Sequence, residues 1–148
     1  MRHFIILAGC AAALAVAPSA RAGLLDGLTC TLSLGSTGTL AMSPTGTFIG
    51  SEAPGGGAAT ILVVASLALP HMLFSAPTVT GPSGWGDTPT TYLSLKAASG
   101  AGVPYTSGAS AIRPGLLLDT ITVNARVENS AGFKESSYTV TSTVMCQQ

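Results

Sequence analysis

Residues 116–127 read Leu-Leu-Leu-Asp-Thr-Ile-Thr-Val-Asn-Ala-Arg-Val, and their alternation decides the fold class. A period of two places apolar side chains on one face of a β-strand and polar side chains on the other. The apolar face consists of Ile121, Val123, Ala125 and Val127, and the polar face of Thr120, Thr122, Asn124 and Arg126. This stretch predicts a long, half-buried strand.

The rest of the chain also reads as strands separated by turns. Residues 129–132, Asn-Ser-Ala-Gly, are typical of a hairpin connection, so we expect residues 136–146 to return beside the first strand. Further strand patterns lie at residues 28–34, 39–42, 45–49 and 92–96. After residue 22 no segment of useful length has a helical period. The sequence therefore predicts an all-β fold, a single antiparallel β-sandwich of about seven strands over residues 23–148.

One apolar run stands out in the middle of the chain, from Thr60 to Leu69, and Pro70 ends it. The run is too short to span a bilayer as a helix. Its β-branched residues favour a strand buried on both faces, in the core or between subunits, although the pattern alone leaves a buried helix open. The residues expected to carry that role are Ile61, Val63, Val64 and Leu67.

The first residues predict a secretory signal peptide. A basic start at Arg2 and an apolar stretch precede Ala20-Arg21-Ala22, which has the small-x-small pattern of a cleavage site after Ala22. A lipidated Cys10 is the alternative, although cleavage there leaves a very short apolar region. The predicted location is secreted, periplasmic or cell-surface, with no membrane span in the processed chain.

Charge is scarce, at 8% of the residues, with a formal net charge of +0. Beyond residue 22, four basic side chains face six acidic ones, a net charge of −2. This balance lacks the basic excess that neutralises phosphates, so nucleic acid is not an expected partner.

Cysteine and histidine usage argues against a metal or catalytic site. Cys30 and Cys146 remain after residue 22, and an even pair in an oxidising compartment predicts a disulfide. His71 is the single histidine of residues 23–148, and the acidic residues are scattered. No Gly-x-Ser-x-Gly motif or carboxylate pair is evident. We expect no enzyme activity, no metal and no cofactor.

Trp85 and Tyr105 lie in regions rich in Gly, Pro and Ser. Exposed aromatic side chains in loops can contact a partner, although a Trp that covers core under a loop is more common. These two residues support one functional hypothesis, a secreted monomeric module that binds a small molecule, glycan or protein.

Residues 114–123, Pro-Gly-Leu-Leu-Leu-Asp-Thr-Ile-Thr-Val, resemble a stretch of secreted bacterial fibre subunits of the chaperone–usher type, including the spore-coat-U-like proteins. The resemblance implies an immunoglobulin-like sandwich, assembly with other protein subunits by strand exchange, and a periplasmic chaperone as helper. It implies a structural or adhesive surface protein of a fibre or envelope layer. Two features differ: a further strand is expected after this stretch, and only residues 23–29 precede Cys30. A self-complete sandwich therefore remains an alternative.

Overall fold

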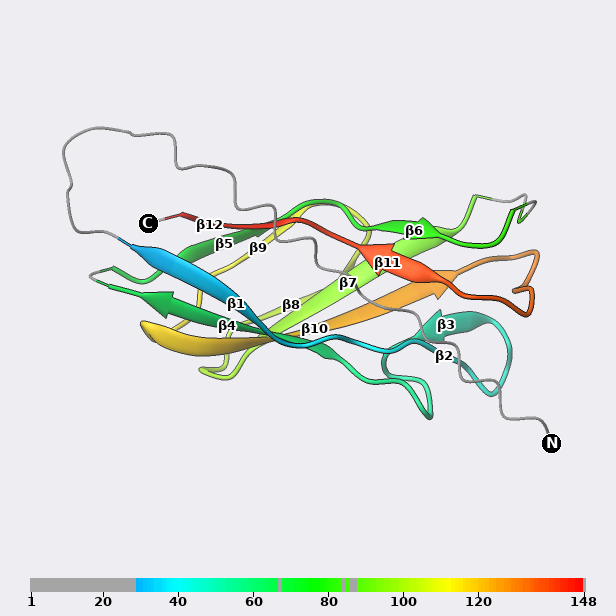
Figure 1. Ribbon diagram of the computed structural model, residues 1–148, viewed down its shortest axis with the longest axis horizontal. Coiled ribbons are helices and arrows are strands. Elements are labelled where there is room, and N and C mark those ends of the chain that lie inside the picture. The colour runs from blue at the N-terminus through cyan, green and yellow to red at the C-terminus, as the bar shows by residue number, and fades with distance from the viewer. Residues whose placement is uncertain (1–28, 67, 84, 86–87, 148) are drawn as a thin grey trace.

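A computed structural model describes residues 29–66, 68–83, 85 and 88–147 (Figure 1). The predicted signal peptide, Cys10 and Leu67 lie outside this part. The described residues form strands and no helix, and all strand pairs are antiparallel, which confirms the all-β prediction. The strands are β1 (Cys30–Ser36), β2 (Ala41–Met42), β3 (Phe48–Gly50), β4 (Ala59–Ala65), β5 (His71–Phe74), β6 (Thr78–Thr80), β7 (Thr90–Ala97), β8 (Gly102–Thr106), β9 (Ser110–Ile112), β10 (Leu118–Glu128), β11 (Thr139–Thr141) and β12 (Val144–Gln147).

Strand β10 is the centre of a seven-stranded sheet. One of its edges pairs with β7, and the other pairs first with β4 and then with β3. β1 lies beyond β4, β2 beyond β3 and β8 beyond β7. Burial alternates along β10 as the sequence predicts, with Ile121, Val123, Ala125 and Val127 buried.

The remaining strands form two smaller sheets, β12-β5-β9 and β11-β6, which lie together along one side of the large sheet (Figure 1). β5 leads into β6, and β11 leads into β12, so the two small sheets are interrupted parts of one antiparallel ribbon. Ser75 bridges the interruption, because its N–H donates to the Thr143 carbonyl at 2.9 Å and its Oγ accepts from the Thr143 N–H at 2.9 Å.

The predicted hairpin between residues 116–127 and 136–146 is wrong. A turn does form, with the Asn129 side chain donating to the Gly132 carbonyl at 2.9 Å and Gly132 at φ 81°. The chain then crosses to the other side, where β11 pairs with β6 and β12 with β5. Both edges of β10 are already occupied, so the returning segment has no free edge beside it.

The pattern of residues 114–119 has a structural explanation at the other end of β10, where the strand begins. The buried Asp119 carboxylate accepts from the Thr120 N–H at 2.8 Å, from the Ser99 N–H at 3.3 Å and from the Ser99 hydroxyl. The Ser99 Oγ in turn accepts from the Gly115 N–H at 2.8 Å. These bonds fix the start of β10 against the turn between β7 and β8.

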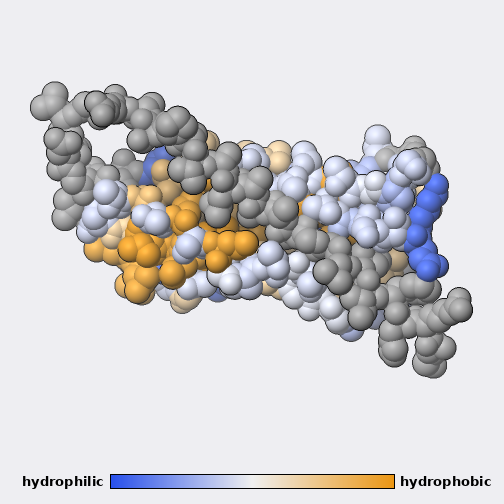
Figure 2. Space-filling model, in the orientation of Figure 1, coloured by the Kyte–Doolittle hydropathy of each residue, from blue (hydrophilic) through white to orange (hydrophobic). Residues whose placement is uncertain are grey.

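Strand β4 is half buried rather than buried on both faces, so that prediction is wrong. Ile61 and Val63 are buried, whereas Leu62 and Val64 are 36% and 43% exposed. No described strand covers the outer face of the large sheet at this point. Figure 2 shows hydrophobic surface gathered at the end of the molecule where β1 begins and β4 ends.

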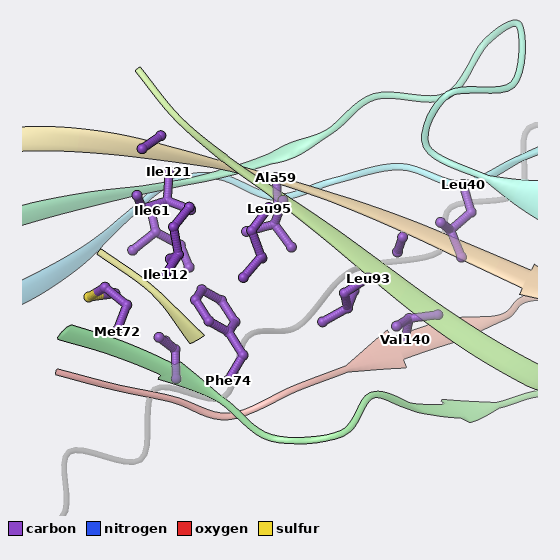
Figure 3. Packing of buried hydrophobic residues seen from close by; sticks show 14 of the residues in the cluster. Leu40, Ala59, Ile61, Met72, Phe74, Leu93, Leu95, Ile112, Ile121 and Val140 are labelled. Atoms are coloured by element: carbon purple, nitrogen blue, oxygen red, sulfur yellow. The ribbon is translucent and has the colours of Figure 1, made fainter. Parts of the chain in front are cut away.

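The hydrophobic core lies between the large sheet and the small ones. Ile61 and Leu95 of the large sheet face Met72 and Phe74 of β5 (Figure 3). Farther along, Tyr138 is fully buried, and its hydroxyl accepts from the Lys134 N–H at 2.8 Å and donates to the Lys134 carbonyl at 2.9 Å. These two hydrogen bonds fix the start of the returning segment against the chain four residues upstream, just after the turn at residues 129–132.

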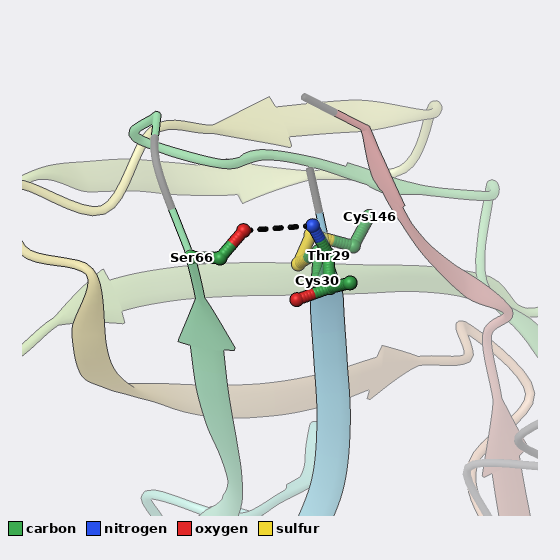
Figure 4. Close-up of a disulfide and its surroundings, with 4 residues drawn as sticks. All are labelled: Thr29, Cys30, Ser66 and Cys146. Atoms are coloured by element: carbon green, nitrogen blue, oxygen red, sulfur yellow. Dashed lines mark hydrogen bonds between the residues drawn. A yellow bond between two sulfur atoms is a disulfide. The ribbon is translucent and has the colours of Figure 1, made fainter. Parts of the chain in front are cut away.

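The predicted disulfide is confirmed: Cys30 of β1 and Cys146 of β12 are bonded, with Cα atoms 6.1 Å apart (Figure 4). It joins the outermost strand of the large sheet to the outermost strand of a small one. The link closes a loop with a sequence separation of 116 residues.

Replacing both cysteines with serine should lower the free energy of unfolding by about 4–5 kcal/mol, because the open chain gains loop entropy when unfolded. Chemical denaturation of the oxidised protein and the double variant measures the difference. Equal denaturation midpoints for the two proteins would contradict a stabilising role for the bond.

Val63→Asp should lower the free energy of unfolding by more than about 4 kcal/mol, because it buries a carboxylate among apolar side chains. Val64→Asp, one residue along the same strand, should cost less than about 1 kcal/mol, since its side chain points to solvent. Thermal unfolding by circular dichroism compares the two. Similar losses in both would refute the assigned faces of β4.

Candidate functional site

An open main-chain edge runs along β1, which pairs with no described strand except β4. The Thr29 N–H donates to the Ser66 Oγ at 2.8 Å, and the Ser66 N–H donates to the Thr29 carbonyl at 3.0 Å, so Thr29 points toward β4. Alternate residues of a strand point their N–H and C=O groups to opposite edges. Leu32 and Leu34 therefore present theirs to the open edge.

Nothing in the sequence of β1 protects this edge. Natural edge strands are usually blocked by charged residues, proline, strong bulges or a covering segment. β1, Cys-Thr-Leu-Ser-Leu-Gly-Ser, contains no charge and no proline, and its one register shift falls near its end, between Leu34 and Ser36. The edge is therefore competent to pair with another strand.

Leu34 is the side chain that marks the site. Period-two alternation places it on the inward face with Cys30 and Leu32, which pack against the core. Yet Leu34 is 39% exposed. A core-facing leucine this exposed indicates that the two layers are not closed at this edge.

A small apolar groove opens beside Leu34, between β1 and the segment that enters β12. Its lining is almost wholly apolar and comes from both layers: Leu34, Ala59, Ile61, Phe74, Leu93, Val123, Ser142 and Val144. Its volume of about 20 Å³ holds roughly one water molecule. Small-molecule sites occupy ~300–1,000 Å³, so the groove as it stands is too small for such a ligand.

Strand β12 forms the other rim, because it is the last strand of its sheet and pairs, among the described strands, only with β5. β1 and β12 meet at the disulfide and diverge away from it (Figures 1 and 4). An intervening strand needs about 9.6 Å, two inter-strand spacings, between its neighbours. The 6.1 Å Cα separation at Cys30 and Cys146 excludes one there, so the disulfide closes that end of the groove.

Tyr105 belongs to a polar cluster on the outer face of the large sheet. Burial, followed by a hydrogen bond and charge repulsion from Glu52, raises the pKa of Tyr105 to about 12, while Ser94 and Arg126 act in the opposite direction. Arg126 pairs with Glu128 at 2.9 Å and lies 4.1 Å from the centre of the Phe48 ring. The contact with Phe48 joins β10 to its neighbour β3, whereas the salt bridge lies within β10, and the buried Arg126 Nε has no hydrogen-bond partner among the described residues.

Trp85 lies in a different cluster and packs against Tyr138 and Phe133, with ring centres 4.8 Å and 6.1 Å away. Its Nε1 donates to the Gly132 carbonyl at 3.4 Å. A Cβ on Gly81 would lie 2.6 Å from the Trp85 ring, so the loop chain approaches it closely. Trp85 thus covers the end of the core. The residues that it contacts differ from those that interact with Tyr105.

The residues of the apolar run that were predicted to lie in one buried strand occupy different environments in the structure. Ile61 lines the groove, Val63 lies in the core, and Val64 faces outward. The sequence interpretation missed Leu34, Phe74 and Val144 as groove residues. The absence of charge and proline in residues 30–36 was the one available signal for an unprotected edge.

The described residues contain no group of three or more His, Cys, Asp or Glu side chains placed to hold a metal ion. They also contain no helix with the length and apolarity needed to cross a membrane.

Comparisons with known proteins leave the site to be interpreted from its geometry. The sequence matches no protein-family model, and neither the curated proteins nor the solved structures yielded a match.

Tyr105 should ionise near pH 12, because its buried neutral form donates a hydrogen bond to Glu52. A folded-state pKa raised from 10.0 favours the folded state fully below pH 10, and this contribution disappears as the pH rises through about 12. Alkaline titration of tyrosinate absorbance measures it. Glu52→Gln should move this transition to lower pH, and Tyr105→Phe should remove it; a transition unchanged in both variants would contradict the assignment.

Proposed function

We propose that this chain is a secreted structural subunit, an immunoglobulin-like β-sandwich that joins other protein subunits by receiving a strand at the groove between β1 and β12. The observation that carries the proposal is the exposed, core-facing Leu34 on an unprotected edge strand. An extended segment added there gains main-chain hydrogen bonds from the edge and specificity from pockets for alternate side chains.

Strand order supports the immunoglobulin-like part of the proposal. Constant-type domains have strands A, B, E and D in one sheet and C, F and G in the other. The order β1-β4-β10-β7 matches A-B-E-D, and the paired ribbon of β5–β6 with β11–β12 matches C and F. Among the described residues, no strand lies in the position of G beside β12.

The Tyr138 hydroxyl adds independent support. A tyrosine near the start of strand F, bonded to main chain a few residues upstream, is a hallmark of these sandwiches. Tyr138 precedes β11 and bonds both main-chain groups of Lys134, four residues upstream.

A core that lacks one strand explains why the groove is apolar. In a seven-stranded sandwich, strand G would cover the side chains between A and F, and here Leu34 is the groove side chain left exposed, whereas Val144 is buried. A strand from another subunit would restore that cover. The resemblance of residues 114–123 to chaperone–usher fibre subunits agrees with this mode and suggests a periplasmic chaperone as a helper before assembly.

The disulfide agrees with secretion, because such bonds form and persist in oxidising compartments. The bond also supports the assembly proposal, since it holds the two rims of the groove together at one end.

Leu34→Lys tests the groove, because an inward-pointing charge on an edge strand opposes strand addition. The wild-type protein, exported and purified, should migrate on unboiled gels as a ladder of stable multimers, and Leu34→Lys should migrate as a monomer. Because Leu34 is already 39% exposed, the variant should remain folded.

Ser33→Lys is the matched control, since Ser33 is adjacent on β1 but points outward and faces β4 with its main chain. It should keep the ladder. A Leu34→Lys protein with an unchanged ladder would refute strand addition at this groove, and a wild-type protein that is only monomeric would refute strand donation between copies of this chain.

A further inference from the structure

A polar cavity opens at the end of the molecule opposite the disulfide, between the turn that joins β2 to β3 and the turn that follows β10 (Figure 1). Its lining comes from these two turns and from Arg126 and Glu128 at the end of β10. Its volume of about 470 Å³ lies within the ~300–1,000 Å³ of small-molecule sites. The described residues that line it include no aliphatic or aromatic side chain, so a ligand would be held here by hydrogen bonds.

Both turns are held in place by their own hydrogen bonds. In the turn before β3, the buried Ser43 Oγ accepts from the Thr47 N–H at 3.2 Å. In the turn after β10, the buried Asn129 side chain donates to the Gly132 carbonyl at 2.9 Å and accepts from the Ala131 N–H at 3.1 Å. The walls of the cavity are therefore preformed, and little ordering entropy would be lost when a ligand binds.

Arg126 is fixed on the wall of this cavity. Its guanidinium carbon lies 4.1 Å from the centre of the Phe48 ring, and its Nη2 lies 2.9 Å from a Glu128 carboxylate oxygen. Gly50 of β3 pairs with Arg126, and a Cβ there would come within 3.3 Å of the Phe48 ring, so this glycine leaves the ring its space. Arg126 and Glu128 lie two positions apart on β10, so both side chains point to the same face of the sheet.

Stability alone does not account for this arrangement. The side chains of Arg126 and Glu128 are 36% and 44% exposed, and ion pairs this exposed contribute little to stability. Within the described part of the chain, the buried Arg126 Nε has no hydrogen-bond partner, which costs stability. A charged side chain that is fixed at such a cost, on the wall of a preformed cavity, indicates a binding role.

The ion pair indicates an uncharged ligand with several hydroxyl groups. Glu128 already neutralises Arg126, and its carboxylate would repel a phosphate or a second carboxylate. Together the two side chains offer N–H donors beside an oxygen acceptor, and every hydroxyl group can both donate and accept. Adjacent hydroxyls of a sugar ring can therefore bond to both side chains at once, and hydrogen bonds to charged groups are the stronger kind.

The other lining residues fit the same ligand. Thr47 and Ser130 contribute exposed hydroxyl groups from the two turns. A lipid chain would find no apolar wall among the described lining residues. A polyphosphate would meet a chain with four basic and six acidic side chains beyond residue 22, which lacks the basic excess that such a ligand needs.

We propose that this cavity binds a neutral sugar residue of a glycan, with Arg126 donating hydrogen bonds to its hydroxyl groups and Glu128 accepting them. The cavity has no lining residue in common with the groove beside Leu34. Sugar binding is therefore independent of strand addition, and Leu34→Lys should leave it unchanged.

NMR titration of the purified, isotope-labelled protein with D-glucose, D-galactose and D-mannose tests the cavity. At least one of these hexoses should shift the amide signals of Thr47, Ser130 and Gly132, with a Kd of about 1–10 mM. Sodium phosphate and sodium acetate, at the same concentrations and pH, should leave these signals in place.

Ser130→Leu should weaken hexose binding at least about tenfold, because it places an aliphatic side chain on the cavity wall. Ser107→Leu is the matched control, since Ser107 is also exposed, lies between β8 and β9 and is not part of the lining. It should bind the hexose like the wild type, and both variants should keep the wild-type melting temperature. Arg126→Gln, which removes the charged donor, should also weaken binding at least about tenfold.

A protein whose three amide signals respond to none of the hexoses would overturn the proposal. Larger shifts with phosphate or acetate than with any hexose would also overturn it and would assign the cavity to an anion. A folded Ser130→Leu or Arg126→Gln protein that binds the hexose as tightly as the wild type would place sugar binding elsewhere on the molecule.

Discussion

Both edges of β10 are hydrogen-bonded, to β7 on one side and to β4 and β3 on the other, and the rest of the fold depends on this saturation. The segment after β10 cannot join the same sheet beside it. It crosses instead to the other side of the core, where Tyr138, Val140 and Val144 bury their side chains. There β12 becomes an edge strand that faces β1, and the groove between them follows from this topology.

Local sequence patterns were sufficient to predict those features of the fold that depend on neighbouring residues or on residue type. The alternation of residues 120–127 gave the buried face of β10 correctly, and the two late cysteines gave the disulfide. Residues 129–132 do form a turn, but turn chemistry fixes only the local chain reversal. Which strand then pairs with the returning segment depends on edges already occupied by β4 and β7, distant in sequence.

The groove could not be found from pattern alone, because it is defined by what does not cover it. Leu34 and Ile121 both occupy inward positions on alternating strands, yet one is 39% exposed and the other fully buried. Val64 is the converse case: a β-branched residue in an apolar run that faces solvent because no described strand covers it. Trp85 and Tyr105 were selected by residue type, and their contacts depend on loops and neighbouring strands.

Strand addition at the groove has a defined assembly geometry. A strand donated by one copy and received by the next is a heterologous contact, which continues into a filament unless the rotation closes. The disulfide closes one end of the groove, so a donated strand would pair with β1 beyond Cys30, and each added copy would repeat the same contact.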